Sequence, residues 1–170
     1  MRCPRLDDLP PAPAGCKGWP WTEGPELVPD TGPDGRSWPV ISIVTPSFNQ
    51  GRFLEETIRS VLLQGYPSLE YIVMDGGSTD DSVDIIRKYE PWLMFWASGP
   101  DQGQSDAINK GFERATGAIW GYINSDDLYE PDALRTAAEI FLSGAEVHLV
   151  AGTTGACAPG LGTNPEKNPA

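Results

Sequence analysis

Two adjacent carboxylates, Asp126 and Asp127, follow directly on an apolar run that is typical of a buried strand. Holding two such charges side by side costs free energy unless a positive charge lies near them. A hard divalent cation is the usual partner, because it takes oxygen ligands and shares them with the phosphates of a substrate. The alternative is that both acids only stabilise the N-terminus of a helix that begins at Pro131. The residue types alone leave both interpretations open.

A second polar stretch, Asp75-Gly76-Gly77-Ser78, follows another apolar run. Its glycines would let a flat base or ribose approach the backbone, and Asp75 would accept hydrogen bonds from that group. The alternative is a loop in which Ser78 or Thr79 only caps the next helix. A third stretch, residues 102–106, opens a helix whose free N–H groups would attract an anion, with a plain cap as the alternative. The dinucleotide and P-loop glycine patterns do not occur, which disfavours those two kinds of site.

Strand-like and helix-like segments alternate about four times between residues 40 and 141. Strands are expected at residues 40–45, 69–74, 93–97 and 118–123, with 147–150 as a fifth. Strands separated by helices are parallel and joined by right-handed crossovers, which predicts an α/β fold with a mainly parallel sheet sandwiched by helices. Ligands of such sheets bind outside the carboxyl ends of the strands. All the polar stretches described above lie at that edge.

The two ends of the chain lack this pattern. Residues 1–38 are rich in Pro and Gly, which predicts an irregular, extended lead-in. Trp19, Trp21 and Trp38 are unusual for disorder, so we expect the lead-in to lie against the domain surface. Residues 39–150 are the expected ligand-binding domain. Residues 151–170 have no periodicity and almost no large apolar side chains, and we expect a disordered tail there.

The composition limits the kinds of partner that the chain is expected to bind. A net charge of −12 argues against bulk binding to nucleic acid or to an anionic membrane, because either polyanion would repel the chain. Three widely spaced cysteines and a single histidine disfavour a zinc site or a disulfide framework and favour a reducing compartment. No run approaches the roughly 20 apolar residues of a membrane span, and the N-terminus lacks a signal peptide's apolar core. We therefore expect a cytoplasmic protein with no transmembrane segment.

Residues 39 to about 141 resemble the family 2 glycosyltransferases, whose fold is called GT-A. Five motifs in the same order carry the resemblance: Ile43-Val44-Thr45-Pro46-Ser47-Phe48-Asn49-Gln50, Ser60-Val61-Leu62-Leu63-Gln64-Gly65-Tyr66-Pro67, Met74-Asp75-Gly76-Gly77-Ser78-Thr79-Asp80, Gly103-Gln104-Ser105-Asp106-Ala107-Ile108-Asn109-Lys110-Gly111 and Asn124-Ser125-Asp126-Asp127. Any one of them would be a weak signal, whereas all five together are specific.

The resemblance implies transfer of a sugar from a nucleotide-diphosphate sugar to a hydroxyl of a saccharide or other acceptor. By similarity Asp75 contacts the base, and the residues that bind the nucleotide sugar are Pro46, Ser47, Asn49, Asp75, Gly77, Gln104, Asn109 and Asp126. A divalent cation, Mg or Mn, would be held by Asp127 and Asp126, with most weight on Asp127 because the pattern is not a strict Asp-x-Asp. In the family this metal bridges the diphosphate and stabilises the charge of the leaving group.

In the family, the general base that deprotonates the acceptor lies beyond the metal motif, where this chain has residues 151–170. The base is therefore expected to be missing, which would leave the acceptor hydroxyl a poor nucleophile. We expect the donor-binding part of a glycosyltransferase, as a gene fragment or a frameshifted product. The alternative is an incomplete protein that only binds nucleotide sugar and metal. A receiver-type signalling domain is disfavoured, because Thr45-Pro46-Ser47 supplies no acid pair after the first strand.

Overall fold

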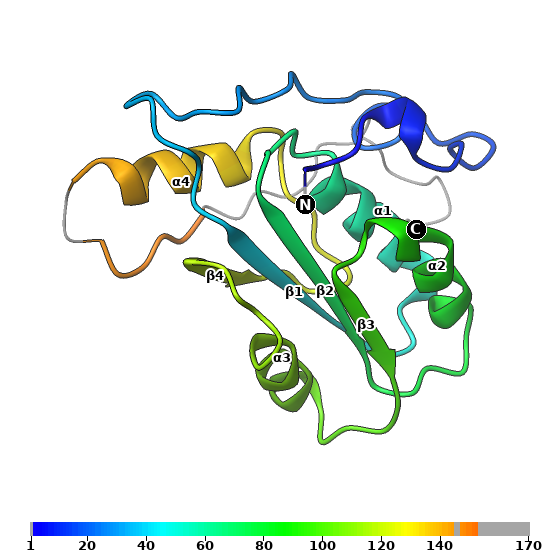
Figure 1. Cartoon of the computed structure of the whole chain (residues 1–170). Coiled ribbons are helices and arrows are strands. Elements are labelled where there is room, and N and C mark those ends of the chain that lie inside the picture. The colour runs from blue at the N-terminus through cyan, green and yellow to red at the C-terminus, as the bar shows by residue number, and fades with distance from the viewer. Residues whose placement is uncertain (1, 145–146, 153–170) are drawn as a thin grey trace.

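Four parallel strands form the centre of the computed structural model, which describes residues 2–144 and 147–152 (Figure 1). The strands are β1 (Ile41–Ser47), β2 (Leu69–Asp75), β3 (Phe95–Ser98) and β4 (Ile119–Tyr122). They lie in the order β3-β2-β1-β4, and every pairing between them is parallel. The central strand β1 is buried at every position, as its apolar, β-branched sequence predicts. The predicted α/β fold with a parallel sheet is confirmed.

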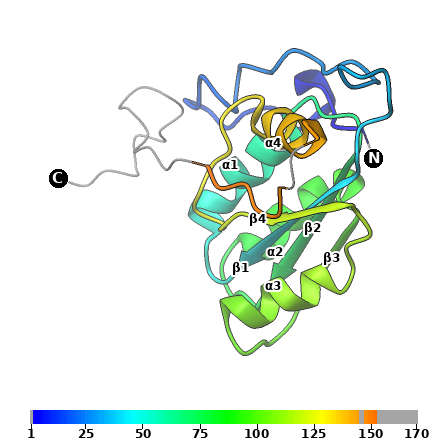
Figure 2. The same ribbon diagram turned by 90° about the vertical axis from the view of Figure 1, so that its left-hand side faces the viewer.

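Helices cover both faces of the sheet. Helices α1 (Gly51–Leu62), α2 (Ser82–Tyr89) and α4 (Ala133–Leu142) lie on one face, and α3 (Gln104–Phe112) lies on the other (Figures 1 and 2). Right-handed crossovers produce this division, because the chain crosses the sheet in one direction from β1 to β3 and returns over the opposite face to reach β4. Two short 3-10 turns, Leu6–Asp8 and Glu90–Trp92, complete the elements of the described residues.

Two local predictions come out differently, and a third is not tested. Residues 147–150 form no strand, and Leu149 is 83% exposed, so the predicted fifth strand is wrong. Helix α2 begins at Ser82, and its first turn is held by Asp80, whose Oδ1 accepts from Ser82 N at 3.0 Å. Capping by Ser78 or Thr79 is therefore wrong. The expected disorder of residues 151–170 lies outside the described residues apart from 151 and 152.

The lead-in, residues 2–38, lies as an irregular layer over α1 and α4 (Figures 1 and 2). Trp19, Trp21 and Trp38 are each 7% exposed or less. The backbone of the lead-in bonds to the segment after α1, from Cys3 N to Tyr66 O at 3.0 Å and from Val28 N to Gly65 O at 3.2 Å. The expectation that this segment lies against the domain is confirmed, and its tryptophans extend the apolar core.

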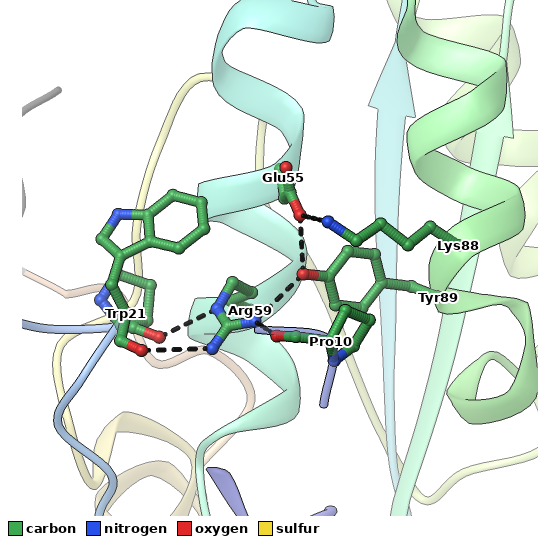
Figure 3. Close-up of polar contacts among 7 residues, drawn as sticks. Pro10, Trp21, Glu55, Arg59, Lys88 and Tyr89 are labelled. Carbon is green, nitrogen blue, oxygen red and sulfur yellow. Dashed lines mark hydrogen bonds and ion pairs between the residues drawn. The ribbon is translucent and has the colours of Figure 1, made fainter. Parts of the chain in front are cut away.

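Arg59 of α1 anchors the lead-in (Figure 3). Its side chain is 1% exposed, and its guanidinium donates to the carbonyl oxygens of Pro10 at 2.8 Å, Pro20 at 3.0 Å and Trp21 at 3.3 Å. The guanidinium carbon also lies 5.1 Å from the centroid of the Trp21 ring. A buried guanidinium has five donors to satisfy, and the lead-in carbonyls satisfy several of them.

The same guanidinium connects α1 to α2. Arg59 Nη1 donates to Tyr89 Oη at 3.1 Å, and Tyr89 Oη donates to Glu55 Oε1 at 2.9 Å (Figure 3). Glu55 also pairs with Lys88. Desolvation by burial raises the pKa of Tyr89, so its hydroxyl stays protonated and keeps donating throughout the neutral range.

At the opposite end of the strands from the carboxyl edge, Glu70 ties β1 and β2 to the turn before β4. Its Oε2 accepts from Ser42 Oγ at 2.6 Å and Thr116 N at 2.9 Å, and its Oε1 accepts from Thr116 Oγ1. Partial desolvation opposes the charge, but the hydrogen bonds from Ser42, Thr116 and Gly117 outweigh it and lower the pKa of Glu70 from 4.5. The ionised form is thus the one that the fold stabilises.

Replacing Glu70 with glutamine is expected to lower the free energy of unfolding at neutral pH by about 1 kcal/mol, because the amide nitrogen cannot accept these bonds. Since the folded pKa is depressed, the stabilisation is present above 4.5 and is lost as the pH falls through the folded value. Urea denaturation at neutral pH and below 4.5 should therefore show the difference between the two proteins shrinking in acid. The exposed Glu23→Gln serves as the control, and an equal loss in both variants would refute the assignment.

Candidate functional site

A cleft of about 620 Å³ opens at the carboxyl edge of the sheet, between the ends of β1 and β4. The chain order switches here, because β1 leads through α1 to β2 on one side while its other neighbour, β4, is reached through α3. Ligands of open parallel sheets bind at such switch points, and the volume is that of a small-molecule site. The cleft is lined by Pro46, Ser47, Phe48, Gln50, Gly76, Pro100, Asp101, Gly103, Gln104, Ala107, Asn124, Ser125 and Asp126.

Four of the predicted site residues lie in this lining: Pro46, Ser47, Gln104 and Asp126. Ser47 has a special environment, because its Oγ is buried and has no hydrogen-bond partner within residues 2–144 and 147–152. A buried hydroxyl without a partner costs free energy. At the wall of a cleft, such a group is available to a ligand that reaches it.

Asp75 is brought to the same edge but does not line the cleft. It is 3% exposed, and its carboxylate accepts hydrogen bonds from Gly77 N at 3.1 Å, Ser78 N at 2.9 Å, Ser98 Oγ at 2.6 Å and Ser78 Oγ. A carboxylate offers about four acceptor positions, so most of its capacity is used inside the protein. The observed role of Asp75 is to fix the loop after β2 to the end of β3, and its contact with a base stays a prediction.

Asn49 also connects loops rather than facing the cleft. Its backbone is left-handed, with φ of 53°, its N donates to Ser78 Oγ at 2.8 Å, and its Oδ1 accepts from Thr79 N at 2.9 Å. Gly77 has φ of 85°, and a Cβ at this position would lie 3.4 Å from backbone atoms of Gly99 and of Pro100, which lines the cleft. The remaining predicted residue, Asn109, is exposed on α3 outside the lining.

The two acids after β4 are placed differently. Both are exposed, but Asp126 lines the cleft and Asp127 does not. Asp127 Oδ2 accepts from Asn124 Nδ2 at 3.0 Å, and Asn124 Oδ1 accepts from Gln104 Nε2. The cleft therefore favours Asp126 over Asp127 as the carboxylate nearest a ligand, which is the reverse of the weighting from the sequence.

The cleft carries negative charge. Its charged lining residues are Asp101 and Asp126, and no Lys or Arg is among the described residues that line it. Lys110 of α3 lies outside this lining and pairs with Asp106 at 2.7 Å. An anionic diphosphate would be repelled here unless a cation accompanied it. Carboxylate, amide and hydroxyl oxygens are suitable ligands for a hard cation.

The protein would supply only part of a metal coordination shell. No group of three or more His, Cys, Asp or Glu side chains in the described ranges is arranged to hold a metal ion. Magnesium and related ions are often held by one or two carboxylates, with substrate phosphates and water completing the shell. The donor set of the cleft fits that kind of shared ion and does not fit an all-protein cage.

Nine of the lining residues were not among the predicted site residues, and two of these bear most directly on ligand binding. Phe48 is 60% exposed at the cleft wall, and Asp101 adds the second carboxylate. An aromatic residue in the middle of the polar turn Ser47-Phe48-Asn49 was the available signal for the first. The sequence around Asp101 gave no such signal, because the position of Asp101 depends on where the loop before α3 lies relative to the other strands.

No described helix has both the length and the apolar character needed to cross a bilayer.

Residues 42–164 match the family described as glycosyl transferase family 2. An uncharacterized glycosyltransferase of Mycobacterium tuberculosis, Rv1514c, is 41% identical over 105 residues, which cover 61% of this chain and 40% of the relative. The putative teichuronic acid biosynthesis glycosyltransferase TuaG of Bacillus subtilis is 35% identical over 107 residues, covering 61% and 42%.

Among solved structures, residues 1–349 of S. aureus TarS in complex with UDP superpose with a TM-score of 0.55 at 25% identity, covering 61% of this chain and 32% of that one. The chain thus spans about two fifths of the length of these curated relatives. The family match extends over most of the chain, and the sheet and its helices correspond to those of a GT-A transferase. The chain belongs to glycosyltransferase family 2.

Proposed function

We propose that this chain provides the donor side of a glycosyltransferase and binds a nucleotide-diphosphate sugar in the cleft between β1 and β4. The observation that carries the proposal is the cleft at the switch point, where the Ser47 hydroxyl has no partner among the described residues and Asp126 lies on the wall. The exposed ring of Phe48 offers a flat face for a base to stack on. TarS, which was crystallised with UDP, supports the choice of ligand.

A divalent cation, Mg or Mn, belongs to the proposal. Asp126 would hold it, with Asp127 beside it, because the negative lining needs a counter-charge before a diphosphate can enter. The bound ion would neutralise charge on the departing diphosphate. The protein's own contributions are to orient the carboxylate, to offer the Ser47 hydroxyl to a ligand oxygen and to stack the base.

A second candidate function is binding of nucleotide sugar and metal without turnover. It is favoured by the cleft lining within the described residues, where both carboxylates are already engaged: Asp126 is assigned to the ion, and Asp101 Oδ1 accepts from Gly103 N at 2.8 Å. Transfer to a hydroxyl needs a group that removes its proton. One experiment separates the two candidate functions: the chain is incubated with UDP-, GDP- and dTDP-sugars, and sugar release or transfer is measured. Sustained turnover would reject the function of binding without turnover.

Replacing Asp126 with asparagine is expected to weaken metal-dependent nucleotide binding by about tenfold, because the amide cannot neutralise the cation. Calorimetric titration of UDP and of GDP, each with and without Mn²⁺, measures this directly. Asp127→Asn in the same titration decides between the two acids, and the smaller effect is expected there. The exposed Asp81→Asn is the matched control. Binding that ignored Mn²⁺ and both substitutions would reject the cation site.

A further inference from the structure

Helix α1 and the turn that follows it present a row of polar side chains to the backbone of the loop that carries the two acids. Thr57, Ser60 and Gln64 are each 0% exposed. A buried polar side chain costs free energy unless it is hydrogen-bonded. All three are hydrogen-bonded to main-chain atoms between residues 125 and 134. Their role is therefore to hold the backbone of this segment in place rather than to fill the core.

Thr57 has the most direct relation to the cleft. Its Oγ1 lies 2.9 Å from Ser125 O and 2.9 Å from Asp127 O, the carbonyl oxygens on either side of Asp126. A hydroxyl has one proton, which these two carbonyls share or take in turn. Thr57 therefore fixes the peptide group before Asp126 and the peptide group after Asp127, while the Asp126 side chain lines the cleft.

The rest of the row holds the loop further along. Ser60 Oγ accepts from Tyr129 N at 3.2 Å, and the Gln64 amide donates to Glu130 O at 3.0 Å and accepts from Leu134 N at 3.2 Å. Helix α1 starts directly after Gln50, which also lines the cleft. One helix thus sets the position of the cleft walls that follow β1 and β4.

We propose that Thr57, supported by Ser60 and Gln64, is a positioning residue that directs the Asp126 carboxylate toward a cation shared with the bound diphosphate. This inference rests on the proposed function. Ion ligands must be held within a few tenths of an ångström. An exposed loop acid has no such precision by itself, and the Thr57 bonds to both neighbouring carbonyls supply it.

The test compares three threonine variants of the full chain. Thr57→Val removes the hydroxyl and keeps the shape, Thr57→Ser restores the hydroxyl, and Thr45→Val removes a comparable buried bond, from Thr45 Oγ1 to Tyr71 Oη at 2.9 Å, outside the loop. Mn²⁺-dependent affinity for UDP and GDP is measured by calorimetry. Thr57→Val is expected to weaken it about fivefold, with Thr57→Ser and Thr45→Val within about twofold of the parent chain. Equal affinities for Thr57→Val and the parent, or an equal loss in Thr45→Val, overturn the inference.

Hydrogen exchange of residues 124–130 without ligand separates the two proposals. Thr57→Val is expected to exchange about fivefold faster there, and Thr45→Val is expected to match the parent chain. If the parent chain binds neither UDP nor GDP with Mn²⁺, the proposed function fails, and this measurement alone decides whether Thr57 holds the loop. Unchanged exchange in Thr57→Val overturns the inference. Should Thr57→Val fail to fold, Ser60→Ala undergoes both measurements with the same criteria.

Discussion

Replacing Arg59 with methionine is expected to lower the free energy of unfolding by about 3–5 kcal/mol. Methionine has a similar length but no donor, so the carbonyls of Pro10, Pro20 and Trp21 lose their bonds to the guanidinium at a buried site. The ring of Trp21 also loses its cation. Urea denaturation followed by tryptophan fluorescence measures the change, which is a large share of the 5–15 kcal/mol that holds most domains.

Arg52→Met is the matched control, because Arg52 lies on the same helix with an exposed side chain. That substitution should change stability by less than about 0.5 kcal/mol. Loss of the anchor should also free the lead-in, so trypsin should cleave after Lys17 faster in Arg59→Met than in Arg52→Met. Equal stability and equal cleavage in the two variants would mean that Arg59 does not hold this segment.

Replacing Gly111 with alanine is expected to lower the free energy of unfolding by about 2 kcal/mol. A Cβ at this position would lie 2.4 Å from Cγ1 and 2.8 Å from Cγ2 of Val44, which is fully buried in β1. Alanine favours a helix by about 1 kcal/mol over glycine. The β-branched Val44 side chain is too stiff to move aside, so the cost of overpacking exceeds this gain in helix propensity. Helix α3 would shift away from the sheet and carry Gln104 and Ala107 with it, so nucleotide affinity should fall as well.

A double-mutant cycle with Val44→Ala checks the cause. The smaller side chain leaves room for the added methyl, so the loss in the double variant should be at least about 1 kcal/mol smaller than the sum of the single losses. Gly99→Ala is the control, because nothing lies within 4 Å of its added Cβ and its φ is not positive. Simple additivity at Gly111 and Val44 would contradict a steric origin.

Local sequence patterns predicted the elements whose partners are near in the chain. The apolar run of β1 and the stripe of Leu54, Ile58 and Val61 on α1 are buried as expected. The run at residues 147–150 has the same local character, yet it forms no ladder, because a strand also needs a neighbour that accepts its hydrogen bonds. The tryptophans predicted that the lead-in lies against the domain, but not which surface it covers, since Arg59 meets Pro20 across 39 residues.

The strand-end rule predicted the edge of the sheet at which the cleft opens, but not the direction of each side chain. Ser47 and Asp126 line the cleft. The carboxylate of Asp75 instead accepts hydrogen bonds from the loop that follows it, and the carboxylate of Asp127 accepts from Asn124. Short polar residues at the ends of strands bond to one another as readily as to a ligand, and their types do not distinguish these two uses. The role of Thr57 could not be predicted from the sequence, because a threonine on the buried side of a helix belongs to no recognisable sequence motif.

The indole of Trp19 donates to Tyr129 O at 2.8 Å, so the first part of the chain contacts the segment immediately after the acids across 110 residues. This contact has a consequence for biosynthesis. At 5–20 residues per second, Tyr129 is made roughly 5–22 seconds after Trp19. During that interval the Trp19 indole lacks this hydrogen-bond partner, and nascent chains would expose it to chaperones until the loop after β4 leaves the ribosome.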